Sequence, residues 1–262
     1  MAAPPAPKGV SMSQIVSVHS FRGGTGKSNT SANLGSLMAL AGKRVAIVDT
    51  DIQSPGIHVL FGLEPEAMKH SLNDYLWGVC DIEEAAHDVG ANVGVEGPGK
   101  VFLIPSSIEA SEIARIIREG YDVGLLNEGF QRLVETLELD VLLIDTHPGV
   151  GEETLLSIAI SDALIIVMRP DQQDYQGTGV TVEIGKKLNV PNMMLLVNKT
   201  PEVFDFDEVK ARVEGTYGTP VAAVVPHSDE MMALASAGVF VTRFPEHRIA
   251  QLYRSVAERI LG

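Results

Sequence analysis

Seven short apolar runs alternate with longer amphipathic segments along most of the chain, and this alternation constrains the fold more than any other feature. The runs are residues 15–20, 45–49, 101–104, 141–145, 163–168, 193–198 and 221–225. Short, nearly continuous apolar runs are typical of strands buried on both faces. Segments between them are expected to be helices, such as residues 28–41 with Leu34, Leu37, Met38 and Ala41 on one side. We therefore predict an α/β fold: a doubly wound, mostly parallel sheet of about seven or eight strands with helices on both faces.

The length and apolar content of the chain favour one folded unit. With 262 residues, 45% of them hydrophobic, the chain can bury one substantial core. We expect a single domain over residues 13–262, preceded by a disordered lead-in of residues 1–12 that is rich in Ala and Pro. The Gly- and Val-rich stretch 90–100 is predicted to be a long surface loop.

Charge and cysteine content exclude several classes of partner. The net charge of −14 opposes strong binding to DNA or to anionic lipid. A single cysteine, Cys80, forms no internal disulfide and supplies no multi-thiolate metal or iron–sulfur site within one chain. These features fit a cytoplasmic, reducing compartment. No apolar stretch approaches the length of a transmembrane segment.

A glycine-rich loop follows the first predicted strand and leads into the first predicted helix. It contains Gly23, Gly24, Thr25, Gly26, Lys27 and Ser28. Glycines let successive backbone N–H groups turn toward phosphate oxygens, and the helix N-terminus favours negative charge. Lys27 is predicted to reach the β- and γ-phosphates, and the Ser28 hydroxyl to ligate Mg²⁺. The sequence therefore predicts a nucleotide-binding loop, although Phe21 stands where the ordinary P-loop pattern has its first glycine.

Acidic residues lie at the ends of two further predicted strands. One strand ends at Asp49, with Asp51 two residues later, and another ends at Asp145. In a parallel sheet these tips lie on the same edge, where ligands bind. Magnesium bound to a nucleotide prefers hard oxygen ligands and keeps several waters, so carboxylates here can hold it through water. A single strand-end Asp is commonly a helix N-cap, but three together favour a metal and phosphate site.

The loop lacking its first glycine resembles the deviant Walker A motif of the MinD/ParA family of ATPases. The resemblance extends from about Ile15 to the C-terminus. Arg22 occupies the position of the signature lysine, which in the family reaches the partner's nucleotide across a dimer. Asn29 stands where a second threonine is common and is included among the expected nucleotide contacts.

The resemblance also implies roles for residues at the strand ends. Asp49 and Asp145 would be magnesium partners, with Asp145 in the Walker B position, and Asp51 would orient or activate the attacking water. Asn198 would contact adenine, and the segment at Pro226 would close over the base. ATP is favoured over GTP because Pro201 stands where a guanine-binding site would have aspartate.

Two further features of the expected site each allow two interpretations. His147 stands where the family more often has proline, and it is either a structural loop residue or a γ-phosphate contact. The polar stretch 169–175, Arg-Pro-Asp-Gln-Gln-Asp-Tyr, either caps a helix or lines a dimer or partner face.

The C-terminal segment 245–262 has an apolar face formed by Ile249, Leu252, Tyr253, Val256 and Ile260. A lipid-binding helix is one interpretation, but the spacing favours the last helix of the core. Four arginines, at positions 243, 248, 254 and 259, are expected to be solvated rather than to form a DNA-binding patch.

The expected function is that of a slow ATPase that dimerises around two ATP·Mg²⁺ and docks an unidentified protein partner in intracellular positioning or assembly. Two alternatives stay open: an ATP-dependent small-molecule ligase or synthase on the same fold, and a non-hydrolysing, nucleotide-dependent scaffold. The nitrogenase-reductase branch of the fold is excluded, because it needs two cluster cysteines per subunit.

Overall fold

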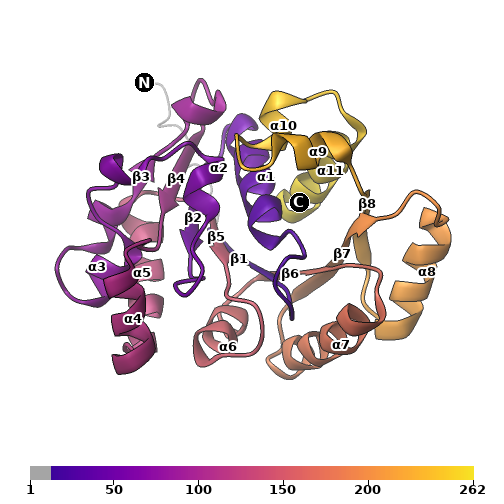
Figure 1. Cartoon of the computed structure of the whole chain (residues 1–262), viewed down its shortest axis with the longest axis horizontal. Coiled ribbons are helices and arrows are strands. Elements are labelled where there is room, and N and C mark those ends of the chain that lie inside the picture. The colour runs from indigo at the N-terminus through magenta and orange to yellow at the C-terminus, as the bar shows by residue number, and fades with distance from the viewer. Residues whose placement is uncertain (1–12) are drawn as a thin grey trace, which may run out of the picture.

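The computed structural model describes residues 13–262, which contain one eight-stranded sheet (Figure 1). The strands are β1 (Gln14–His19), β2 (Arg44–Asp49), β3 (His87–Asp88), β4 (Lys100–Ile104), β5 (Val141–Asp145), β6 (Ala163–Met168), β7 (Asn192–Thr200) and β8 (Val221–Pro226). Their order is β3-β4-β2-β5-β1-β6-β7-β8, and every neighbouring pair is parallel except β3 with β4. β1 therefore lies inside the sheet, at the point where successive connections turn to opposite sides.

Helices fill the connections between the strands. The α-helices are α1 (Lys27–Leu40), α2 (Ile57–Leu60), α3 (Leu72–Leu76), α4 (Ala110–Glu119), α5 (Val123–Thr136), α6 (Glu152–Ala159), α7 (Gln172–Lys187), α8 (Phe206–Tyr217), α9 (Asp229–Leu234), α10 (Phe240–Arg243) and α11 (Arg248–Leu261). Three short 3₁₀ helices are η1 (Pro65–Ala67), η2 (Ile82–Ala85) and η3 (Ala91–Val93).

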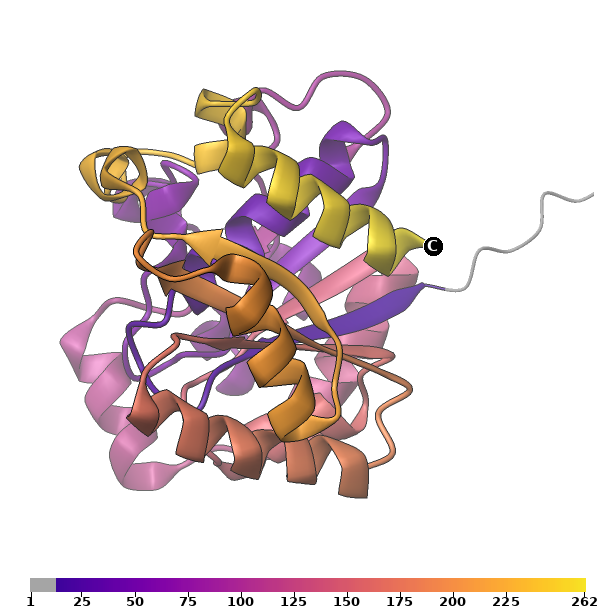
Figure 2. The same ribbon diagram turned by 90° about the vertical axis from the view of Figure 1, so that its right-hand side faces the viewer.

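Apolar side chains that alternate along each strand form a separate core on each face of the sheet. On one face Val16, Ile47 and Leu143 pack with α1 and α11. On the other, strand residues pack with α5 in one cluster and with α7 and α8 in another. Figure 2 shows α11 along one face and α7 along the opposite face. This three-layer arrangement confirms the predicted doubly wound α/β fold.

The predicted strands are found with small changes at their ends, and β3 is the strand that the sequence did not indicate. β3 has only two residues and pairs antiparallel with β4, so it leaves no periodic pattern. The 90–100 stretch begins with η3, and Val93 in it is buried. The expected lead-in, residues 1–12, lies outside the described residues.

Helix α1 corrects the predicted single apolar stripe. Nearly all of its side chains are buried, including polar ones, because α10 and α11 cover the side that faces away from the sheet. Ala41, assigned to the stripe, follows the helix and is exposed.

Helix α11 confirms the interpretation of the C-terminal segment as core. Ile249, Tyr253, Val256 and Ile260 are buried against α1 and the sheet, while Leu252 is half-buried. Over residues 13–262, none of the helices combines the length and the apolar character needed to span a membrane.

Candidate functional site

The glycine-rich loop lies at the carboxyl end of β1, in the middle of the sheet. Gly24 and Gly26 have φ angles of 78° and 96°, which residues with a side chain rarely adopt. A Cβ atom on Gly26 would also lie 2.4 Å from Nδ2 of Asn198. Gly26 is the N-cap of α1, so the loop and the helix N-terminus form a turn of the kind that suits phosphate.

Phe21 explains how the loop folds without the usual first glycine. A Cβ on Gly177 of α7 would lie 2.1 Å from the Phe21 ring, so the ring packs directly on the backbone of that helix. The aromatic ring thus fixes the start of the loop against α7, where a glycine would leave it unsupported.

Lys27 is buried among the acidic residues that the sequence predicted around it. Its Nζ atom lies 3.2 Å from Oδ1 of Asp145 and 3.9 Å from Oδ2 of Asp51. Ser31, one turn further along α1, donates a hydrogen bond to the same Asp145 oxygen. The structure therefore brings the loop lysine and the acidic strand ends into one site.

Asp49 and Asp145 lie directly opposite each other on the neighbouring strands β2 and β5. Burial, and then the negative charge of Asp145, raises the pKa of Asp49 to about 7. Asp145 Oδ2 is buried and has no hydrogen-bond partner. Two buried carboxyl groups with spare acceptor capacity fit a nearby divalent cation or its bound water.

The donor set fits magnesium that arrives with a nucleotide, rather than a metal held by protein side chains alone. Among residues 13–262 no cluster of three or more His, Cys, Asp or Glu residues could hold a metal ion. Ser28 lines a cavity of about 260 Å³ together with the loop glycines, Lys27 and Asp51. Mg²⁺ commonly takes only one or two protein ligands and completes its shell with phosphate and water.

The predicted base-binding residues line an adjoining cavity of about 470 Å³. Its walls include Gly26, Asn29, Asn198, Pro226, Met231 and Met232. Asn198 is buried; its amide donates to the Thr25 carbonyl at 2.8 Å, and its Oδ1 accepts from the Lys199 backbone. In this structure Asn198 is thus tied to the phosphate loop.

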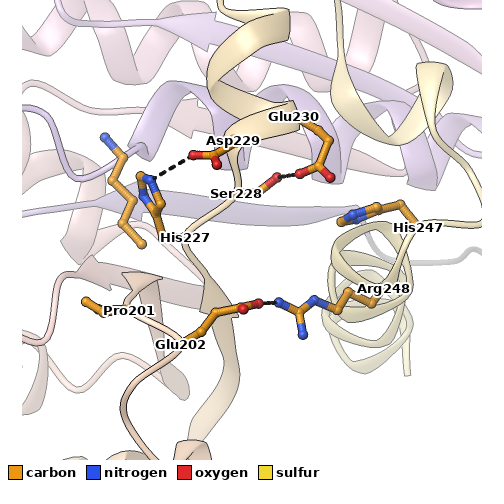
Figure 3. Close-up of a pocket in the computed structure, with 9 residues that line it drawn as sticks. Pro201, Glu202, His227, Ser228, Asp229, Glu230, His247 and Arg248 are labelled. Carbon is orange, nitrogen blue, oxygen red and sulfur yellow. Dashed lines mark hydrogen bonds and ion pairs between the residues drawn. The ribbon is translucent and has the colours of Figure 1, made fainter.

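A larger cavity of about 740 Å³ adjoins the base pocket and shares Lys199, His227 and Ser228 with it. Figure 3 shows His227 directed toward Asp229 on one side and an ion pair between Glu202 and Arg248 on another. Both basic and acidic side chains line this cavity, so its lining does not select one sign of charge.

Lys199 is a site residue that the sequence analysis did not single out. Its ammonium group donates to the Gly24 carbonyl at 2.8 Å, which places a second lysine on the phosphate loop. Its backbone has a φ of 54°, unusual for a residue with a side chain. The signal available in the sequence was its position directly after Asn198.

Arg22 is directed toward the start of α7. Its Nη1 atom lies 3.2 Å from Oδ1 of Asp174 and 3.8 Å from Oδ1 of Asp171. Asp174 is only 2% exposed and also bonds Arg169, whose Nε lies 3.2 Å from its Oδ2. Asp171 additionally caps α7 through the backbone N–H groups of residues 173 and 174. Part of the 169–175 stretch therefore caps the helix, and part of it binds Arg22.

His147 makes the contact that the sequence analysis did not foresee. Its Nδ1 lies 2.7 Å from Oδ1 of Asp51, so the loops after β2 and β5 are joined above Lys27. This hydrogen bond is the main reason that the pKa of His147 is raised above its usual value.

His19 at the end of β1 is buried, with Nδ1 2.7 Å from the Thr146 hydroxyl. Burial and the nearby charge of Lys27 lower its pKa to about 3. Its folded-state pKa thus lies below its unfolded value, so the unfolded chain gains a proton first, and stability falls as the pH drops below about 6.5. Asp49, with a raised pKa, has the opposite effect over the same range.

A His19→Asn variant separates the two effects. Asparagine keeps a polar group for Thr146 but does not titrate, while Asp49 is common to both proteins. From pH 7 to pH 5, the unfolding free energy should shift in favour of the variant by up to about 2 kcal/mol. Urea unfolding at both pH values measures this shift, and a difference that does not vary with pH would contradict the assignment of a buried, neutral His19.

Comparison with known proteins agrees with this arrangement. A ParA family model, described as NUBPL iron-transfer P-loop NTPase, matches residues 11–261. An uncharacterised ATP-binding protein of Methanocaldococcus jannaschii is 31% identical over 252 residues, covering 96% of this chain and 89% of the relative. The septum site-determining protein MinD of Bacillus subtilis is 26% identical over 261 residues, covering 96% and 90%.

A solved structure shares the fold. MinD of Pyrococcus horikoshii, complexed with Mg-ADP, superposes with a TM-score of 0.78 at 21% identity, covering 95% of this chain and 96% of that one. Since the family model spans nearly the whole chain, the family follows directly from these matches. The chain belongs to the MinD/ParA family of P-loop NTPases.

Proposed function

We propose that this protein is an ATP-dependent dimerisation switch that hydrolyses ATP slowly and uses its two nucleotide states to dock and release a protein partner. The observation that carries the proposal is the cluster of Lys27, Asp51 and Asp145 at the mouth of a phosphate cradle. Lys27 lies among carboxylates there, and an entering triphosphate would supply a further anionic partner for this lysine.

The proposed nucleotide lies across the two adjoining cavities. Gly23 to Ser28 would hold the phosphates through backbone N–H groups and Lys27, and the 470 Å³ cavity at Asn198 and Pro226 would take the base. Ser28, Asp49 and Asp145 would hold Mg²⁺, directly or through water. Bound Mg²⁺ neutralises phosphate charge and so favours departure of ADP.

Asp51 is proposed to orient the attacking water. It lies two residues after Asp49, and its Oδ2 lies 3.9 Å from Nζ of Lys27. The water oxygen bonds to the γ-phosphorus, the bond from that phosphorus to the β–γ bridging oxygen breaks, and the water proton passes to the carboxylate or the released phosphate. Because such a transition state needs mainly positioning and charge neutralisation, small displacements of these groups control the rate.

Dimerisation is proposed because Arg22 does not face its own Lys27. Its side chain is 39% exposed and pairs with acids of α7. A second subunit could receive this guanidinium at its own γ-phosphate, where the planar fork suits phosphate oxygens. Hydrolysis would then require association, and the polar start of α7 would lie at the dimer or partner face.

The competing functions make different demands on the chain. A ligase or synthase would turn over only with an added metabolite, whereas the switch hydrolyses ATP alone. A scaffold would show no turnover. Iron transfer would need cysteine thiolates to bind the metal. Cys80 is the sole thiol in the sequence, and burial raises its pKa to about 11, which disfavours its thiolate form. A single cysteine and an acidic chain suit a cytoplasmic switch without strong DNA binding.

Mixing two inactive variants tests the proposal. Arg22→Ala and Asp51→Ala homodimers should each hydrolyse ATP poorly, since every site lacks one group. In a mixed dimer, the Arg22→Ala subunit keeps Asp51 and receives Arg22 from its partner. A 1:1 mixture should therefore regain about a quarter of wild-type turnover, because half the dimers are mixed and each has one complete site.

The same experiment measures ATP turnover by the wild type without added metabolite. Light scattering follows the ATP-dependent shift of the wild type from monomer to dimer. Lack of both in the wild type would end the switch hypothesis. If the wild type is active but the mixture stays inactive, Arg22 acts within its own subunit and the trans role is wrong.

A further inference from the structure

Two loops from neighbouring strands meet through one side-chain pair at the nucleotide site. Asp51 follows β2 and His147 follows β5, and Nδ1 of His147 lies 2.7 Å from Oδ1 of Asp51. We propose that His147 is a positioning residue that fixes the Asp51 carboxylate for the attack of water on the γ-phosphate. This inference deepens the proposed ATPase function and rests on it.

The hydrogen bond leaves the two carboxylate oxygens of Asp51 in different surroundings. Oδ1 accepts the imidazole N–H, while Oδ2 lies 3.9 Å from Nζ of Lys27, on the side of the cavity that the phosphate loop lines. With Oδ1 held, rotation of the carboxylate is restricted, and Oδ2 is the oxygen presented to a water beside the γ-phosphate. A carboxylate without this partner would sample several rotamers, and only some of them point an oxygen at that water.

The main chain at His147 is held by neighbouring elements of the fold. The backbone carbonyl of His147 accepts a hydrogen bond from the hydroxyl of buried Thr154 on α6, at 3.4 Å. The preceding residue, Thr146, is buried and bonds the Val18 carbonyl at 3.1 Å in the sheet. Pro148 follows, and the residue before a proline is restricted to extended conformations. The backbone at His147 is therefore held by the sheet and by α6. A residue that positions another side chain needs such support.

Asp51 needs such support because it lies beyond the end of β2, where no ladder of hydrogen bonds fixes it. Its own backbone N–H donates to Asp49 at 3.0 Å, which orients the main chain but not the carboxylate. The carboxylate is thus positioned by His147 and by the longer contact to Lys27.

Three substitutions of His147 distinguish a role of its hydrogen bond to Asp51 from a purely structural role of the residue. An asparagine amide can occupy the place of the imidazole Nδ1, whereas a glutamine amide reaches the place of Nε2, which does not contact Asp51. His147→Ala should lower kcat about ten- to a hundredfold with little change in KM for ATP. His147→Asn should restore most of the lost kcat, and His147→Gln should resemble alanine.

Steady-state ATPase assays of the full-length wild type and the three variants give kcat and KM, and calorimetric titration of ATP confirms that each variant still folds and binds. Unchanged kcat in His147→Ala overturns the inference, as does rescue by glutamine equal to or better than rescue by asparagine. A parallel loss of ATP affinity in His147→Ala shows a structural role and also overturns it. An inactive wild type instead rejects the proposed ATPase function, on which the inference depends.

Discussion

Replacing Lys27 with alanine is expected to abolish ATP binding. In the structure Lys27 is the cation that the phosphate cradle presents, buried between Asp51 and Asp145. Without it, the triphosphate would approach several carboxylates with no buried positive charge between them. Loss of one partner from a desolvated charge pair typically costs about 2–5 kcal/mol, so the dissociation constant should rise by about thirtyfold to several thousandfold.

Calorimetric titration with ATP and Mg²⁺ measures this change. Lys187→Ala is the matched control, because Lys187 is an exposed lysine in the last turn of α7, away from the phosphate loop. Lys27→Gln serves as a second variant that retains a donor for the buried Asp145. Unaltered ATP affinity in either Lys27 variant would contradict the assignment of the phosphate site.

Replacing Asp51 with alanine is expected to trap an ATP-bound dimer. The variant keeps the glycine loop, Lys27 and the Asp49–Asp145 pair, so it should bind ATP and associate. It lacks the carboxylate that orients water, and loss of a positioned general base typically lowers the rate by 10²–10⁴-fold. ATP-bound dimers should therefore persist long after wild-type dimers have hydrolysed their nucleotide and separated.

Size-exclusion chromatography with light scattering, run with ATP and then with ADP, follows this persistence, and phosphate release gives the rate. Asp207→Ala, an exposed aspartate in the first turn of α8, is the control and should behave as wild type. Rapid hydrolysis by Asp51→Ala would remove this residue from the mechanism. Failure to dimerise with ATP, despite tight binding, would remove it from the switch.

The sheet and the phosphate loop could be predicted because they depend on local sequence patterns. Buried parallel strands such as β5 and β6 read as continuous apolar runs, and their observed bounds match the prediction. The convergence of Asp49 and Asp145 followed from topology alone, since parallel strands end on one edge. The spacing of the loop glycines before Lys27 and Ser28 was enough to predict the loop.

Contacts between loops could not be predicted, because nothing local specifies them. His147 and Asp51 are separated by 96 residues, and their meeting depends on the exact path of two loops. The same holds for Lys199 on the Gly24 carbonyl and for Arg22 on Asp174. A pattern can place a residue at the right edge of the sheet, but only the folded chain decides which neighbour its side chain reaches.

The paired arginines at Asp174 have a consequence for the proposed movement of Arg22 toward a second subunit. Two guanidinium groups share this buried carboxylate, and Arg169 bonds it through its backbone N–H as well as its side chain. If Arg22 swings away toward another subunit, Arg169 stays behind, and the acid keeps a positive neighbour in its dry surroundings. Departure of Arg22 would then leave no unpaired buried charge on Asp174, so the proposed exchange would cost little electrostatic free energy and would be readily reversed.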